Sequence, residues 1–297
     1  MLKAYNTRAL WVALGANLSI FAIKAVSALI SNSAAMFSEA LHSLADLVNS
    51  IFLLIGIRLA IRPADEEHPF GYGKEVYFWS FVASIFMLGV TSMGSLLKGY
   101  GQIKDPHPLE HFSLTIAALV IATCIEALAV HSAMQGVLRE AGHNAHGLKL
   151  IPESFQVLEK VANPAIKLVF FEDLVAFFGV VLALAAIVAV KLTNYLILDG
   201  LVSILIGVTL SILAITLAYE NRELIIGRAA TDSLEQLIGD IALNTPRVKD
   251  VHSLKTMYLG PKSLLVNMEI EVDPHMTVDK MDDVVADVES RIKQKIP

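Results

Sequence analysis

Six long apolar stretches run through residues 1–219, and polar residues interrupt them in only a few places. Each stretch reaches about 20 residues or more, which is the length that a helix needs to cross a bilayer. The connections after the first and the fifth stretch are very short, so each predicts a tight helical hairpin. The predicted membrane spans are residues 9–30, 33–60, 76–98, 113–138, 165–190 and 194–219.

Beyond Tyr219 the pattern changes to that of a water-soluble domain. Two amphipathic helices enclose two segments in which apolar and polar residues alternate, as they do in half-buried strands. This α-β-β-α order predicts a small sheet with helices on one face. The predicted helices are residues 232–242 and 277–295, and the predicted strands are residues 251–258 and 263–272.

We therefore expect a membrane protein with two domains. The first is a six-helix transmembrane bundle of residues 1–219, and the second is a cytoplasmic α/β domain of residues 220–297. The second domain is expected to lack its last strand, because the chain stops at Pro297 where a further strand could complete the sheet.

The composition supports a multi-pass membrane protein, since 55% of the residues are hydrophobic and 18% are charged. The net charge of -6 is spread over loops and the tail, so it predicts no nucleic-acid partner. The single cysteine, Cys124, lies within an apolar run. This excludes a disulfide framework within one chain and a cysteine-rich metal cluster.

Basic residues predict how the chain is oriented in its membrane. They are frequent at the N-terminus and in every second connection, and sparse in the others, and the basic side faces the cytoplasm. Both termini are expected on the cytoplasmic side of a bacterial inner membrane, or on the equivalent side of an organelle membrane. The residues of the basic side are Lys3, Arg8, Arg58, Arg62, Lys74, Arg139, Lys149, Lys160 and Lys167.

Polar side chains within two of the spans are the candidate functional residues. The second span carries four of them in a stripe about 80° wide on its helix, and the fifth span carries an adjacent acidic pair. A charge at membrane depth costs at least about 2.5–3.5 kcal/mol, so it marks an ion or proton site. The stripe is Glu39, His42, Asp46 and Asn49, and the pair is Glu172 and Asp173. Together they predict a cation transporter.

The spacing of His42 and Asp46 suits a metal ion, because residues four apart share one helix face. Zinc binds nitrogen and oxygen ligands at about 2.0–2.2 Å. These ligands must lose their protons to bind, which offers a route to metal–proton exchange. Glu39 has two readings: a vestibule or interhelical charge, or a ligand or proton carrier. Lys24 and Glu126, single charges in other spans, are expected to pair between helices or to extend toward the interface.

Several motifs together resemble the cation diffusion facilitators, which are dimeric six-helix transporters that exchange divalent metal for protons. The resemblance covers nearly the whole chain and implies a homodimer with a metallochaperone-like cytoplasmic domain. The motifs are Ser33-Ala34-Ala35-Met36 before His42-x-x-x-Asp46, His68-Pro69-Phe70-Gly71-Tyr72-Gly73-Lys74, Asp199 at the start of the sixth span, and Gly260-Pro261-Lys262.

The resemblance implies a transport site with two ligands from the second span and two from the fifth. His42 and Asp46 match the first pair, and Asp173 matches the aspartate of the second. Val169 stands where the family has histidine or aspartate, so Glu172 or water is expected to take the fourth position. The run Phe171-Glu172-Asp173 resembles a branch whose animal members are mitochondrial zinc transporters.

Two further metal sites are considered outside the bilayer. In the loop of residues 65–72, Asp65 and His68 resemble a family site, but Tyr72 stands where a second histidine is usual. The alternative is a solvated acidic turn. In the tail, His252 is considered together with Asp282 and His275 as a cytoplasmic site, although family sites there use more histidines and residues of the missing strand.

These observations lead to the expectation of a zinc efflux protein that is not an enzyme. Its substrate would be Zn²⁺, exchanged for protons across the lipid bilayer by alternating access. A manganese or iron(II) exporter is an alternative, because a glutamate in place of an imidazole hardens the site. A non-transporting metal sensor or scaffold is the alternative from another class.

Overall fold

The computed structural model describes residues 7–143, 147–158, 164–261 and 263–296. Lys3 and Lys160, which carry part of the orientation argument, and Lys262 lie outside these residues. The chain divides into two compact units. One unit comprises residues 1–61 and 75–222, and the other comprises residues 62–74 and 223–297.

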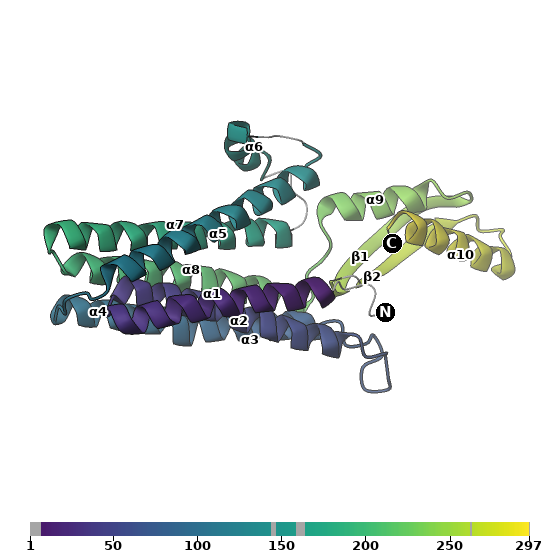
Figure 1. Ribbon diagram of the computed structural model, residues 1–297. Coiled ribbons are helices and arrows are strands. Elements are labelled where there is room, and N and C mark those ends of the chain that lie inside the picture. Colours follow the sequence, from purple (N-terminus) through teal and green to yellow (C-terminus); the bar gives the residue numbers. More distant parts are fainter. Residues whose placement is uncertain (1–6, 144–146, 159–163, 262, 297) are drawn as a thin grey trace. The chain divides into compact units, whose positions relative to one another are not determined.

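The first unit is a bundle of long helices (Figure 1). Six helices in the described residues are long and apolar enough to span a membrane, which confirms the predicted number of spans. The third of them contains a π-helical segment, η2, between two α-helical parts. The spans are α1 (Thr7–Ser31), α2 (Ala34–Ala60), α3 (Glu75–Phe86) with η2 (Met87–Ser92) and α4 (Met93–Lys104), α5 (Phe112–Glu140), α7 (Pro164–Thr193) and α8 (Ile197–Ile226).

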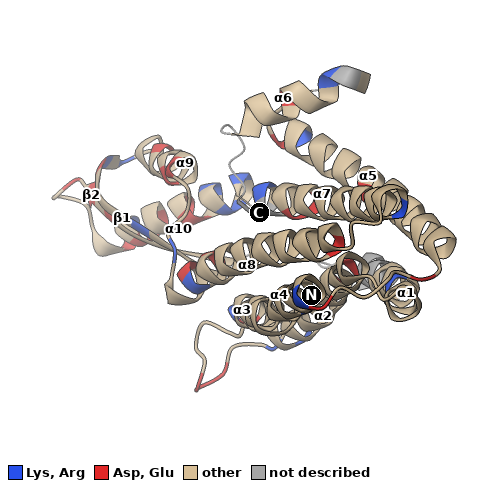
Figure 2. Cartoon of the chain, turned by 90° about the vertical axis from the view of Figure 1, so that its left-hand side faces the viewer, with Lys and Arg blue, Asp and Glu red and all other residues tan. Residues whose placement is uncertain are grey.

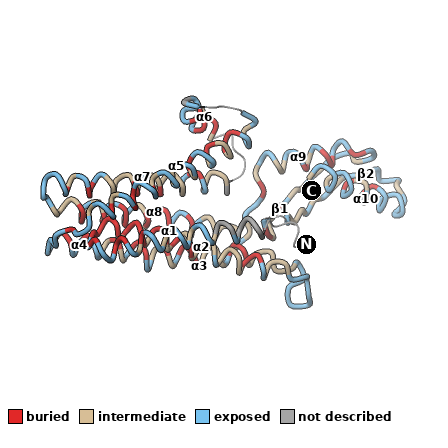
Figure 3. The backbone as a smooth tube through the Cα atoms, viewed as in Figure 1, coloured by how far each residue is buried: buried red, intermediate tan, exposed pale blue. Residues whose placement is uncertain are grey.

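The charged residues of α8 lie only toward its two ends. In Figure 2, α8 is free of Lys, Arg, Asp and Glu along the middle of its length. The buried core lies between the helices and contains small and branched side chains such as Ala35, Leu119, Val180 and Leu210 (Figure 3). An apolar exterior around such a core is what a lipid solvent demands of a helical bundle.

Small residues bring the third and sixth spans close together. A Cβ placed on Gly99 of α4 would lie 2.7 Å from the carbonyl oxygen of Gly200 on α8, so neither position has room for a side chain. Ser203 donates a hydrogen bond of 2.9 Å to the carbonyl oxygen of Ser95. Close backbone approach and hydroxyl hydrogen bonds are the usual means of helix association in lipid.

Asp199 on α8 fixes the start of α2, the helix that carries the polar stripe. Its carboxylate accepts hydrogen bonds from the backbone N–H groups of Ala34, at 2.6 Å, and Ala35, at 3.2 Å. It also accepts one of 2.6 Å from the hydroxyl of Ser33, the N-cap residue of α2. These bonds satisfy N–H groups that the first turn of a helix leaves free. They anchor α2 to α8 at this end.

The long fourth connection contains two short helices that the apolar pattern did not predict. They are η3 (Gly147–Lys149) and α6 (Leu150–Val157). Phe155 of α6 packs edge-on against Phe170 of α7, with ring centroids 5.3 Å apart. Leu150 and Val157 are buried in the same cluster. This segment therefore packs against α7 by its apolar side.

The second unit has the predicted α-β-β-α order. Its elements are α9 (Asp232–Leu243), β1 (Val248–Gly260), β2 (Ser263–Val272) and α10 (Val278–Lys295). The two strands pair antiparallel, with Val251 opposite Ile270. β1 begins three residues earlier than residue 251, the predicted start. The loop of residues 62–74 belongs to this unit, and its Gly73 lies so close to the carbonyl oxygen of Leu259 that a Cβ would clash with it.

Candidate metal centre

A cavity of about 220 Å³ lies among α1, α2, α5 and α7 in the first unit. All four residues of the predicted transport site, His42, Asp46, Glu172 and Asp173, line it. The remaining polar lining comes from Asn17, Ser43, Asn49, Ser50 and Glu126. A cavity in a helical bundle with several converging polar groups is a typical ligand site.

The α2 wall of the cavity carries an imidazole without a hydrogen-bond partner. His42 is only 2% exposed, and neither of its ring nitrogens is hydrogen-bonded within the described part of the chain. Oδ2 of Asp46 lies 3.8 Å from Nε2 of His42. Buried polar atoms are normally paired, so unpaired imidazole nitrogens at a cavity wall fit a site that binds an ion.

The α7 wall carries both acidic residues of the fifth span. Glu172 and Asp173 line the same cavity, although adjacent residues on a helix point about 100° apart. Val169 is 51% exposed and is not among the lining residues. The structure therefore places Glu172 at the cavity wall and leaves Val169 outside it.

The ligand atoms of the cavity are more widely spaced than those around a bound ion. In the described residues, the only three metal-ligating side chains whose atoms lie within 4.8 Å of one another are in the tail. Ligands about 2.0–2.2 Å from one zinc ion must lie closer together than that. An ion in this cavity would therefore require α2 and α7 to bring their side chains nearer.

Glu39 does not line this cavity. It faces a smaller one of about 40 Å³ between α2, α7 and α8, and His42 borders both cavities. Oε2 of Glu39 accepts a hydrogen bond of 3.0 Å from Nζ of Lys24 on α1. The geometry thus places Glu39 in an interhelical ion pair, one of its two readings from the sequence.

Lys24 and Glu126 pair between helices, which is one of the two outcomes expected for them from the sequence. Lys24 is 1% exposed, and its Nζ lies 3.6 Å from Oε1 of Glu126 on α5. The same ammonium thus bridges α1 to α2 and to α5. The sequence alone did not indicate that Glu126 lines the cavity with His42 and Asp173. The available signal was a lone acidic residue in a span, but that signal does not say which neighbour the residue faces.

The loop residues Asp65, His68 and Tyr72 lie together in the second unit. Asp65 accepts hydrogen bonds of 2.7 Å from the Tyr72 hydroxyl and 2.7 Å from the His68 backbone N–H. The Tyr72 bond, with the His68 bond second, lowers the pKa of Asp65 below its usual value. Nδ1 of His68 is 3.7 Å from Oδ1 of Asp65. The candidate ligands Asp65 and His68 are therefore neighbours, and the Tyr72 hydroxyl is hydrogen-bonded to the second carboxylate oxygen of Asp65.

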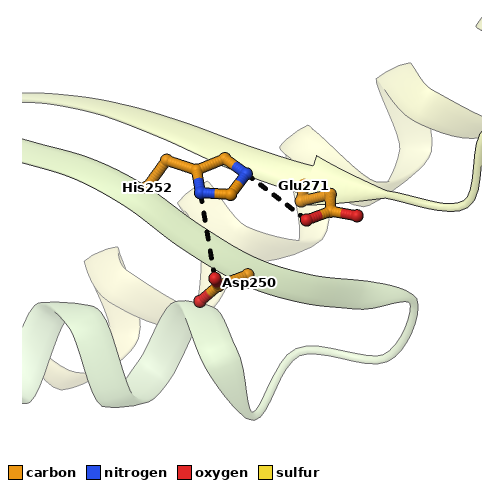
Figure 4. A group of neighbouring side chains, drawn as sticks. All are labelled: Asp250, His252 and Glu271. Carbon is orange, nitrogen blue, oxygen red and sulfur yellow. Dashed lines mark ion pairs between the residues drawn. The ribbon is translucent and has the colours of Figure 1, made fainter.

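In the tail, His252 lies beside Asp250 and Glu271 rather than beside the expected Asp282 and His275 (Figure 4). Nε2 of His252 is 3.3 Å from Glu271, and Nδ1 is 3.8 Å from Asp250. The reason is the strand geometry. Asp250 and His252 are two apart on β1 and share a face, and Asp250 is opposite Glu271 in the register. All three residues are exposed.

The chain matches the cation efflux transmembrane domain over residues 10–226. It also matches the cation efflux protein cytoplasmic domain over residues 230–297. The chain belongs to the cation efflux family. This is a family of transporters and not of enzymes, and the six apolar spans make the chain a multi-pass membrane protein.

Curated relatives of this cation efflux protein come from plants, animals and bacteria. It is 27% identical to metal tolerance protein C4 of Arabidopsis thaliana, over 92% of this chain and 59% of the relative. It is 28% identical to the mitochondrial proton-coupled zinc antiporter SLC30A9 of Xenopus laevis, over 85% of this chain. The chain covers only 44% of that antiporter's length. It is 26% identical to the magnetosome protein MamM of Paramagnetospirillum magneticum, over 96% of this chain and 83% of the relative.

Proposed function

We propose that this cation efflux protein carries a divalent metal ion, with zinc as its preferred substrate, in exchange for protons. The transport ligands are His42, Asp46, Asp173 and Glu172. The observation that carries the proposal is the four-helix cavity in which these side chains meet, with an unpaired His42 at its wall. The relative named as a proton-coupled zinc antiporter supports both the ion and the exchange.

The position of His42 between the two cavities supports alternating access. An ion bound at His42 in the larger cavity passes to the other side when the bundle rearranges and opens the smaller cavity. Protons compete with the ion for the imidazole and the carboxylates, because these ligands bind metal only when deprotonated. Metal leaving and protons arriving are therefore coupled at the same atoms.

Manganese or iron(II) is the second candidate substrate. The observation that favours it is the excess of carboxylates, since Asp46, Glu172 and Asp173 line the cavity with a single imidazole. Oxygen ligands suit harder ions, whereas zinc tolerates nitrogen and sulfur as well.

We also propose that the protein is a homodimer in a bacterial inner membrane or an organelle membrane, with both termini on the cytoplasmic side. The match to the dimer-type cytoplasmic domain supports the dimer. The proposed domains remain residues 1–219 and 220–297. Asp65 and His68 are proposed as a subsidiary loop site, because their ligand atoms lie 3.7 Å apart.

Flux measurements in proteoliposomes test the proposal. The full chain is reconstituted, a pH gradient is imposed, and uptake of zinc, manganese and iron(II) is followed with an ion-sensitive dye. The expected result is zinc uptake that collapses when the gradient is removed. Faster uptake of manganese or iron(II) would make that ion the preferred substrate in place of zinc. Absence of flux for all three ions would indicate a sensor or scaffold.

A further inference from the structure

Within the described residues, Glu126 is the one acidic residue lining the cavity that is not among the proposed ligands. Four carboxylates line the cavity, and three of them are the proposed ligands Asp46, Glu172 and Asp173. Glu126 reaches the same space from α5, the helix that packs along α7. Asp173 and His42 line this cavity too, so an ion that they hold shares the space that the Glu126 carboxylate borders.

The cavity shows independently that it is a ligand site. His42 is 2% exposed and Ser43 is 3% exposed, and both line the cavity. Neither the ring nitrogens of His42 nor Oγ of Ser43 has a hydrogen-bond partner in the described residues. Buried polar groups without partners are rare in folded proteins. Glu126 thus faces a space in which other groups are arranged for a ligand.

Lys24 holds its two carboxylates unequally. Its Nζ is 3.0 Å from Oε2 of Glu39, a hydrogen-bond distance, but 3.6 Å from Oε1 of Glu126. A separation of 3.6 Å is too long for a hydrogen bond, so charge alone attracts Glu126 to the ammonium. Glu126 can consequently turn toward the cavity while Lys24 stays bound to Glu39.

We propose that Glu126 is a further metal-binding residue of the transport site, and that Lys24 limits how tightly the site holds its ion. The proposal rests on the proposed transport function. A divalent ion and the Lys24 ammonium compete for the same carboxylate, and charges interact strongly where water is scarce. A transporter needs a site that binds well enough to load and weakly enough to release. An internal ammonium beside one ligand provides that limit.

Zinc binding to purified full-length protein tests this assignment by calorimetry at constant pH. Glu126→Gln is expected to weaken zinc binding by about tenfold to 100-fold, the range seen when groups that support a metal site are lost. Glu140→Gln is the matched control, because Glu140 is exposed at the end of the same helix. It should bind zinc like the wild-type protein.

Lys24→Gln is expected to tighten zinc binding severalfold and to slow zinc release in the flux assay. The double variant Lys24→Gln/Glu126→Gln should bind zinc as weakly as Glu126→Gln, because the ammonium acts through Glu126. Lys24→Gln alone leaves Glu39 buried without its cation. The same comparison is therefore repeated with Glu39→Gln in every variant, which removes that unpaired charge.

Wild-type zinc affinity in Glu126→Gln would overturn the assignment and leave Glu126 as a structural partner of Lys24. The role of Lys24 would be overturned if Lys24→Gln tightened zinc binding equally in the wild-type and the Glu126→Gln backgrounds. The ammonium would then simply repel the ion. If Glu126→Gln does not fold, comparison of the double variant with Lys24→Gln gives the same answer. Failure of the wild-type protein to bind zinc, manganese or iron(II) would instead overturn the proposed function.

Discussion

Replacement of Asp199 should loosen the start of α2 and with it the wall of the metal cavity. Asp199 is completely buried, and its carboxylate accepts hydrogen bonds from the backbone N–H groups of Ala34 and Ala35. Asp199→Ala leaves both N–H groups without that acceptor. Each buried donor that loses its partner costs about 1–3 kcal/mol, so the pair costs about 2–6 kcal/mol. Asp199→Asn keeps one carbonyl oxygen as an acceptor and should cost about half as much.

The assay is unfolding of the purified protein in mixed detergent, followed by circular dichroism, together with zinc affinity of the folded protein. We expect Asp199→Ala to unfold at a clearly lower fraction of denaturing detergent than Asp199→Asn. It should also bind zinc more weakly, because His42 is two turns along the same helix. Ser38→Ala is the control. It removes the 2.7 Å hydroxyl contact between Ser38 and Ser203, which also joins α2 to α8, but keeps the cap. Equal stability and equal zinc affinity of the two Asp199 variants would refute the reasoning.

Three further outcomes are expected. Asp46→Ala and Asp173→Ala should each abolish zinc flux, because each removes a ligand and a negative charge from a site for a divalent ion; near-normal flux in a folded variant would contradict the ligand assignment. Glu172→Gln should weaken zinc binding measured by calorimetry, and unchanged affinity would make Glu172 a structural charge. In Tyr72→Phe the pKa of Asp65 should rise toward its usual value, because the hydroxyl bond that lowers it is lost. Asp65 stabilises the loop above its unfolded pKa, and this stabilisation is lost as the pH falls through its folded pKa. The variant loop should therefore loosen at a higher pH than the wild-type loop does. The carboxyl chemical shift of Asp65 in nuclear magnetic resonance measures this pKa.

The apolar pattern was sufficient for the membrane spans and for the faces of the tail elements. A bilayer admits only segments whose backbone groups bond internally, so long apolar runs must be helices. The helices α1, α2, α3 with α4, α5, α7 and α8 follow the predicted spans. Of the polar stripe on α2, Glu39 and His42 are buried, at 0% and 2% exposure, and Asp46 and Asn49 are half-buried. Periodicity identifies the face of a helix because it depends on neighbouring residues alone.

Only the tertiary structure decided which faces meet. The bond of Asp199 to α2 joins residues 165 positions apart, and no local pattern predicts such a partner. Lys24, Glu39 and Glu126 come from three different helices, and their rotation against one another depends on side-chain packing throughout the bundle. In the tail, strand register placed Glu271 near His252. The sequence by itself therefore determined the spans and the candidate ligands, whereas long-range packing determined that Glu126 shares their cavity.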